Sequence, residues 1–344
     1  HEGLISIPKA LKRINKEYKT AHFGKWGMGS SPAVLGYDIS DGPTKNKDGN
    51  FDNNKSQWQN VIKKDPKNIF SLTEKAIQFI DTCSKKKTPF FLQISHYAVH
   101  SNIESKSKSY THFKEKPKGN RHIDPGFAAM TFNLDQSLGI LLKKIKDLEL
   151  EDNTYIIYMS DNGSVPNIPG AKKYDKSYNY PLSRGKWDAY EGGVRVPLIV
   201  SGPGIKKGSE SSMPVSGSDI LPTLIDLAGD KKVVLSEIDG GSFVSVLFIK
   251  NIKKIKREVE GIFFHVPYKN GIAIKRPHSA VRKDDYKLIK FEDDKSILLF
   301  NLVEDKMEQL NIATQNPQKA KELEEILDSY LVDVKAPKWK DGIT

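Results

Sequence analysis

Apolar runs and segments of helical spacing alternate along the first part of the chain. Ser71–Cys83 and Phe127–Leu148 carry apolar residues at helical spacing, which predicts two amphipathic helices. Phe90–Ser95 and Thr154–Ser160 are continuous apolar runs, typical of strands buried on both faces. Because strands alternate with helices, the pattern predicts an α/β fold with a mostly parallel sheet flanked by helices.

Capping signals accompany these helices. Asp124 and Pro125 precede the second long helix, and Ser71, with Glu74 three residues further on, predicts a cap for the first. The further elements predicted are a helix at Ile7–Lys16, strands at Tyr18–Phe23 and Val194–Val200, and a helix at Ile220–Ala228.

The pattern changes after about Gly241. Short strands without intervening helices are expected there, followed by an amphipathic helix at Pro317–Val332. These strands are Gly261–Val266, Ala280–Arg282, Tyr286–Phe291 and Ile297–Leu302. We therefore expect a large α/β domain over residues 1–241 and a smaller C-terminal α+β subdomain, with an antiparallel sheet, over residues 242–344.

Composition narrows the function classes. The formal net charge is +11, but the lysines are spread widely and lack the interleaved aromatics of a single-strand-binding surface. A nucleic-acid partner is therefore not expected, whereas an anionic substrate would suit this charge. No window approaches the ~20 apolar residues of a membrane span. Cys83 is the only cysteine, so no intrachain disulfide can form.

Polar clusters directly follow three predicted strands. Gly24-Lys25-Trp26 follows the first strand, His96–His100 follows Phe90–Ser95, and Asp161-Asn162-Gly163 follows Thr154–Ser160. Ligands of such sheets bind outside the carboxyl ends of the strands. We therefore expect these clusters to meet in one cleft.

The residue types allow more than one chemistry. Asp161 and Asn162 offer hard oxygens suited to Ca²⁺ or Mg²⁺, although an Asp-Asn-Gly turn needs no metal. His96 and His100 lack a third ligand cluster for zinc. A histidine at this position is either a proton donor to a leaving oxygen or a structural residue.

A basic loop lies upstream of the strand at Val194–Val200. It contains Arg184-Gly-Lys186 and Glu191–Pro197. Lys25 and Lys186 are suited to holding the oxygens of a tetrahedral anion, and surface charge beside a glycine hinge is the alternative.

These clusters, in this order, resemble the type I sulfatases of the alkaline phosphatase superfamily. The similarity covers nearly the whole chain, and the ordered series is more specific than any one piece. Its stretches are Tyr18–Gly29, Pro89–His100, Tyr158–Gly163, Arg184–Pro197, Asp219–Thr223, Asp239–Ser242, Ser279–Arg282, Asp285–Leu288 and Leu299–Leu302.

The resemblance implies a role for each matching residue. It implies an alkaline-phosphatase-like fold, Ca²⁺ with Mg²⁺ as the alternative ion, and a sulfated carbohydrate or other sulfate ester as substrate. It assigns His100 and Lys186 to catalysis, Lys25, His96, Arg195 and His278 to substrate binding, and Asp161 and Asn162 to the metal. A periplasmic or secreted location is implied as well, and the oligomeric state stays open.

One departure from the family pattern concerns the nucleophile. The family uses a formylglycine made in a Cys/Ser-x-Pro-x-Arg motif, preceded by an Asp-Asp pair that completes the metal site, and the sequence contains neither. Cys83 has neither the proline nor the arginine, and Gly27 stands where many members have histidine. The missing parts are expected upstream of the first residue, so we expect this chain alone to be inactive. The rival functions are a non-catalytic sulfated-glycan binder and a related phosphodiesterase or phosphatase.

Overall fold

The first part of the molecule contains a three-stranded parallel sheet. The computed structural model describes residues 5–120, 122–166, 179–229, 238–249, 252, 254–269 and 274–339. β1 (Lys19–Gly24) pairs in parallel with β2 (Ile39–Ser40) on one side and with β4 (Phe90–Ser95) on the other. Gly24 lies opposite Ser95, so the loops after β1 and β4 leave the sheet at the same edge.

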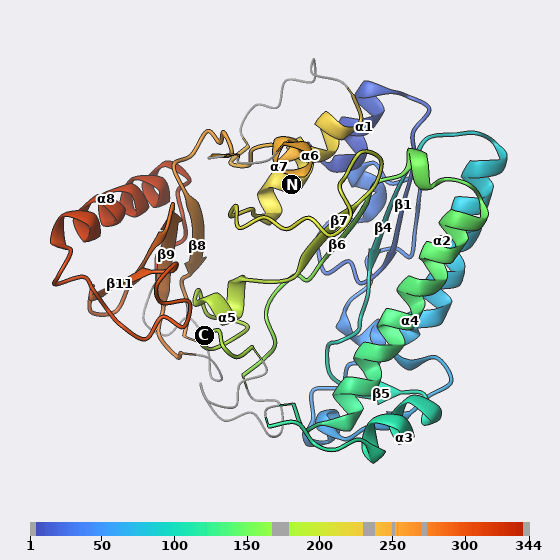
Figure 1. The fold of residues 1–344 in the computed structure, drawn as a ribbon, viewed down its shortest axis with the longest axis horizontal. Helices are drawn as coiled ribbons and strands as arrows, with labels where there is room; N and C mark the ends of the chain where they lie inside the picture. Colours follow the sequence, from blue (N-terminus) through green and yellow to red (C-terminus); the bar gives the residue numbers. More distant parts are fainter. Residues whose placement is uncertain are drawn as a thin grey trace.

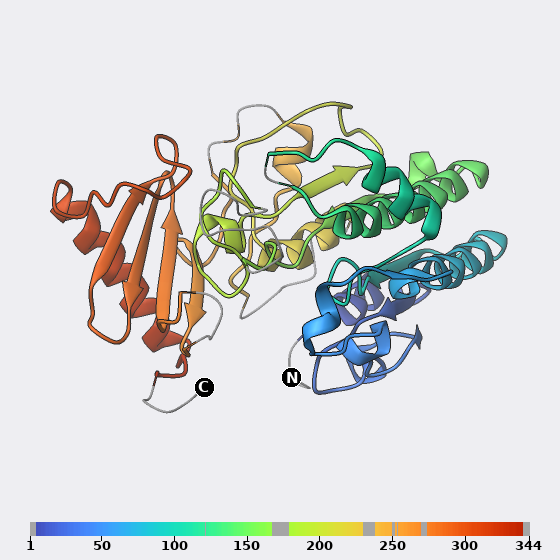
Figure 2. The same ribbon diagram turned by 90° about the horizontal axis from the view of Figure 1, so that it is seen from below.

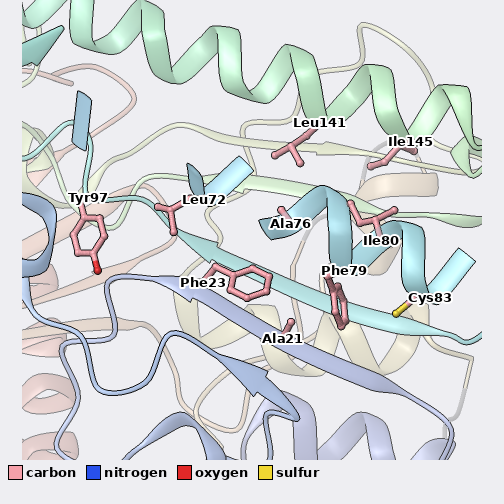
Figure 3. Close-up of a cluster of buried hydrophobic side chains, with 10 residues drawn as sticks. All are labelled: Ala21, Phe23, Leu72, Ala76, Phe79, Ile80, Cys83, Tyr97, Leu141 and Ile145. Atoms are coloured by element: carbon pink, nitrogen blue, oxygen red, sulfur yellow. The ribbon is translucent and has the colours of Figure 1, made fainter. Parts of the chain in front are cut away.

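Two long helices lie side by side, and one of them packs against the strands of this sheet (Figure 1). α2 (Ile69–Lys85) and α4 (Pro125–Asp147) bury their apolar positions in one cluster with the inward residues of β1. Figure 3 shows this cluster, which includes Ala21, Phe23, Leu72, Phe79 and Leu141. The helical spacing of the sequence and the apolar strand are therefore explained by one shared core.

The predicted cap of α4 is confirmed, and the predicted cap of α2 is wrong. The Asp124 carboxylate accepts a hydrogen bond from the Phe127 N–H at 2.9 Å. Ser71 instead lies inside α2, which begins at Ile69. The Asp65 carboxylate accepts the N–H groups of Phe70 and Ser71, because the chain turns through left-handed residues just before the helix.

The strands that follow α4 form a separate ladder. β6 (Ile156–Met159) and β7 (Leu198–Ser201) pair with each other, and the pairing is antiparallel. The strand predicted at Val194–Val200 therefore begins later than expected, and it pairs antiparallel with β6 rather than in the parallel manner that alternating strands and helices predict. The chain is helical at α5 (Glu191–Val194) and enters β7 only afterwards, running opposite to β6.

The C-terminal part is an antiparallel sheet covered on one face by a helix (Figure 2). The strands, in the order β11-β10-β9-β8, are β8 (Ile262–Val266), β9 (His278–Lys283), β10 (Tyr286–Phe291) and β11 (Ile297–Asn301). α8 (Pro317–Asp333) packs on β9 and β10. The predicted antiparallel sheet and final helix are confirmed, and the parallel sheet with flanking helices agrees with the predicted fold class.

The remaining elements connect these layers. α1 packs against α6, and α6 against α7. Arg257 pairs with the buried Asp219 at 2.6 Å, which holds part of the segment before β8 against α6.

The division into two domains at residue 241 stays a prediction. The remaining bounds are α1 Ile7–Ile14, β3 Val61–Ile62, β5 Glu104–Ser105, α3 Ser107–Glu115, α6 Ile220–Leu227, α7 Val244–Phe248, and 3₁₀ turns at Pro32–Leu35, Asn46–Gly49, Lys55–Trp58, Pro66–Asn68, Glu151–Asn153 and Gly217–Asp219. Among the described residues, no helix has the length and apolarity to span a membrane.

Candidate active site

The loops after β1 and β4 are joined where they leave the sheet. The Lys25 N–H donates to the Ser95 carbonyl at 2.7 Å. Gly24 has a φ of 98°, and a Cβ at this residue would lie 2.2 Å from the Ser95 oxygen. Only glycine therefore allows this approach. As a result, Lys25 and the His96–His100 segment start from neighbouring positions.

His100 is held by its backbone and by an aromatic ring. Its Nδ1 lies 2.8 Å from the Ser101 carbonyl oxygen, and the Phe51 ring packs edge-on at 4.8 Å. A carbonyl can only accept, so Nδ1 carries the hydrogen and Nε2 is the nitrogen that titrates. Burial lowers the pKa of His100, and the positive charges of Lys186, Lys25 and Lys67 lower it further.

Lys186 lies on a loop that is joined to the turn after β6. The Gly163 N–H donates to the Gly193 carbonyl at 2.9 Å, and the Lys186 N–H donates to Ser164 at 3.1 Å. A Cβ at Gly163 would lie 1.8 Å from the Gly192 oxygen, so this contact also requires glycine. The loop bearing Lys186 and the turn bearing Asp161 are thus packed backbone to backbone.

Charge interactions link residues of these separate loops. Burial lowers the pKa of Lys186, the Asp161 carboxylate opposes this, and Lys25 adds to the lowering. Lys25 and Lys186 also both act on His100. Lys25 and Lys186 therefore lie close enough to His100, and Asp161 to Lys186, for their charges to interact, and the assignment of these residues to one active site stays a prediction.

Asp161 and Asn162 fit a hard divalent cation by donor type. Asp161 is exposed at the end of β6. The Asn162 Nδ2 donates to the Gly163 carbonyl at 3.0 Å, which leaves its Oδ1 for a ligand. A carboxylate and an amide oxygen are Ca²⁺ ligands, but Ca²⁺ takes six to eight oxygens. Within the described ranges, no group of three or more His, Cys, Asp or Glu residues is placed to hold a metal.

The histidine before Tyr97 is also close to the site in sequence. Burial lowers the pKa of His96 to about 4, so its ring is neutral at neutral pH. Its Nδ1 is buried and has no hydrogen-bond partner among the described residues. A buried ring nitrogen without a partner is costly to the folded state. The role of His96 in substrate binding stays a prediction.

The other two residues assigned to substrate lie elsewhere. Arg195 is exposed, and its Nη1 lies 3.7 Å from the buried Glu191 carboxylate, so its role stays a prediction. His278 is fully buried in β9. Its Nε2 accepts the Ala189 N–H at 3.0 Å, and its Nδ1 donates to the Arg276 carbonyl at 2.8 Å. With no exposed surface, His278 cannot touch a substrate in this structure, and instead supports the loop that bears Lys186.

A buried ion network, which sequence reasoning missed, fastens the same loop. Lys287 on β10 has no exposed side-chain surface and lies 3.0 Å from Glu191 and 2.9 Å from Glu308. The Glu191 N–H also donates to the Glu308 carboxylate at 2.7 Å. The sequence offered one signal, because Lys287 is flanked by apolar residues within a predicted strand.

Comparisons with known proteins place the chain in a family. The profile of the family described as Sulfatase matches residues 3–230, and the profile described as N-sulphoglucosamine sulphohydrolase, C-terminal, matches residues 185–336. The chain therefore belongs to the sulfatase family, and the resemblance to type I sulfatases of the alkaline phosphatase superfamily is confirmed.

Individual relatives agree with this. A protein named Sulfatase from Formosa agariphila is 29% identical over 309 residues, which cover 83% of this chain and 54% of that protein. An N-acetylgalactosamine-6-O-sulfatase from Bacteroides thetaiotaomicron is 27% identical over 274 residues, 75% of this chain and 50% of that protein. The crystal structure of Ps i-CgsB matches with a TM-score of 0.74 and 25% identity, over 96% of this chain and 74% of that one. The chain spans about half the length of the first two relatives.

Proposed function

We propose that this protein hydrolyses sulfate esters of a carbohydrate. The observation that carries the proposal is that the charges of Lys25 and Lys186 both act on His100, although the three residues come from separate loops. Two ammonium groups beside a histidine suit a tetrahedral oxyanion that carries a leaving alcohol. The name of the N-acetylgalactosamine-6-O-sulfatase relative supports a sulfated sugar as the substrate.

In this proposal the lysines bind the anion. Lys25 and Lys186 donate hydrogen bonds to the non-bridging sulfate oxygens and stabilise the charge that develops on them. Because the side chain of Lys186 is half-buried, its charge is less screened there than at the surface. His96 and the exposed Arg195 are the candidates for contacts with the sugar.

His100 is the general acid that protonates the leaving group. Nδ1 is committed to the Ser101 carbonyl, so Nε2 gives its proton to the ester oxygen as the sulfur–oxygen bond breaks. Before substrate binds, the lowered pKa of His100 leaves its ring largely neutral at neutral pH. A bound sulfate ester offsets their charge and raises the pKa, so the ring takes up its proton when the substrate binds.

Two groups complete the proposed chemistry. Asp161 and Asn162 would contribute ligands to a calcium ion, which would bind and polarise the sulfate. The nucleophile would be a hydrated formylglycine, and a Cys/Ser-x-Pro-x-Arg motif is absent from the printed sequence.

The test uses the protein as its gene encodes it. Sulfate released from oligosaccharides bearing N-acetylgalactosamine 6-sulfate is measured by ion chromatography. We expect Lys186→Ala to lower kcat/KM by about 10² to 10³-fold. Lys207→Ala, at an exposed lysine, is the control and should have no effect.

Two outcomes would contradict the proposal. Faster hydrolysis of phosphate esters than of sulfate esters would favour a phosphatase or phosphodiesterase. Binding of the sulfated oligosaccharide without any release of sulfate would favour a non-catalytic glycan binder.

A further inference from the structure

Lys67 is a buried lysine in the turn that precedes α2. The residue is 1% exposed, and its backbone adopts a φ of 52°. The Lys67 N–H donates to the buried Glu104 carboxylate at 2.7 Å, and its Nζ donates to the Ser101 carbonyl at 3.1 Å. Hydrogen bonds therefore fix this residue at its backbone and at the end of its side chain.

The Ser101 carbonyl oxygen that binds Lys67 also binds His100. It accepts from His100 Nδ1 at 2.8 Å and from Lys67 Nζ at 3.1 Å. Because both donors share one oxygen, Nζ and Nδ1 lie less than about 6 Å apart. The ammonium draws electron density from the carbonyl, so the same oxygen stabilises a charged imidazole less well.

We propose that Lys67 is a positioning residue that fixes the ring of His100 and weakens its hold on the Nε2 proton. The effect on His100 follows from contacts within the chain, and only its use in catalysis rests on the proposed function. A ring that releases its proton easily is a stronger acid toward a leaving oxygen. Lys67 itself touches neither substrate nor reacting atoms in this scheme.

The charges that face His100 agree with this. After burial, the groups that lower its pKa are Lys186, Lys25 and Lys67, whereas its bond to Ser101 raises it. Burial lowers the pKa of Lys67 to about 8, opposed by Glu104. Lys67 is therefore mostly charged at neutral pH and loses its charge in mildly alkaline solution.

The test follows the His100 ring by NMR in the full chain with labelled histidines. The resonance is assigned by its loss in His100→Gln. We expect Lys67→Met to raise the pKa of His100 by about one unit, because it removes a cation and a competing donor. Lys64→Met is the control, because it changes an exposed lysine in the same segment and should leave the pKa of His100 unchanged. Lys67→Arg keeps the charge and should hold the pKa within about half a unit of wild type.

The inference would be overturned if Lys67→Met folds and the pKa of His100 stays at its wild-type value. It would also be overturned if Lys67→Arg shifts the pKa of His100 as far as Lys67→Met does. If Lys67→Met does not fold, the inference is tested by titrating the His100 resonance of the wild-type protein. Its His100 resonance should inflect a second time near the pKa of Lys67, at about 8, and absence of that inflection refutes the coupling.

Activity provides a separate readout. In the active protein, the alkaline limb of the kcat profile should move up by the same shift in Lys67→Met and stay in place in Lys64→Met. The NMR measurements need no turnover. A protein that shows the coupling but releases no sulfate would therefore contradict only the proposed function.

Discussion

Lys287 is the cation of a buried network, and its removal tests what holds the loop of Lys186. The side chains of Lys287, Glu191 and Glu308 are at most 2% exposed, and the ammonium lies within 3.0 Å of both carboxylates. In Lys287→Met the volume is nearly kept and the charge is lost. Two carboxylates then remain in a nearly dry site, and Arg282 and Arg195 lie 3.6 Å and 3.7 Å from Glu191.

The magnitude follows from this burial. Breaking a buried ion pair by removing one partner typically destabilises by about 3–5 kcal/mol. We expect a loss of that size in the free energy of unfolding, measured by urea denaturation at pH 8. Lys283→Met is the matched control, because Lys283 on β9 pairs with the exposed Glu260 and Glu322. A surface pair of this kind contributes about 1 kcal/mol or less.

The effect should also depend on pH. Burial raises the pKa of Glu308, and Lys287 opposes the rise. Without Lys287 the folded-state pKa rises further above its unfolded value, so the folded state takes up a proton as the pH falls. The destabilisation should therefore be smaller at pH 5 than at pH 8. A loss below about 1 kcal/mol, or one that is equal at both pH values, would refute the reasoning.

Two further predictions concern β1. Gly24→Ala should destabilise by about 2 kcal/mol or more and lower sulfate release, because its Cβ would meet the Ser95 carbonyl at a positive φ. Gly29→Ala, where a Cβ meets nothing within 4 Å, is the control, and equal effects in thermal melting would contradict the argument. Burial lowers the pKa of His22 to about 4. The stability of the folded state linked to neutral His22 is therefore present above an unfolded pKa of about 6.5 and is lost as the pH falls to 4. His22→Gln should remove up to about 3 kcal/mol of that pH dependence in urea titrations, and an unchanged slope would count against it.

The sequence predicted most of the fold because its signals are local. The apolar run of β4 and the helical spacing of α4 identify these elements directly. The pairing of β6 with β7 was not predictable, because strand direction depends on distant parts of the chain. The cap of α2 was missed because Asp65 reaches its first turn across two left-handed residues, which the sequence pattern does not indicate.

The candidate site divides in the same way. Lys25 and Asp161 follow strands, so the rule of strand ends locates them. Lys67 lies in a polar stretch and looks like a surface lysine in the sequence, whereas the apolar neighbours of Lys287 are the only local signal of its burial. The surrounding packing shows that both lysines are buried. His278 was predicted to bind substrate because the sequence does not show whether a histidine is buried or exposed. In the structure it is buried.

The attachment of the Lys186 loop to the C-terminal sheet has a consequence for anion selectivity. Lys25 is anchored to β4, whereas the loop bearing Lys186 is anchored to β9 and β10 through Ala189 and Glu191. The loop bearing Lys186 is therefore held both by the turn after β6 and by the antiparallel sheet. If Lys25 and Lys186 bind one anion as proposed, a substitution that loosens the contacts of Ala189 or Glu191 changes the spacing of the two ammonium groups without touching that anion.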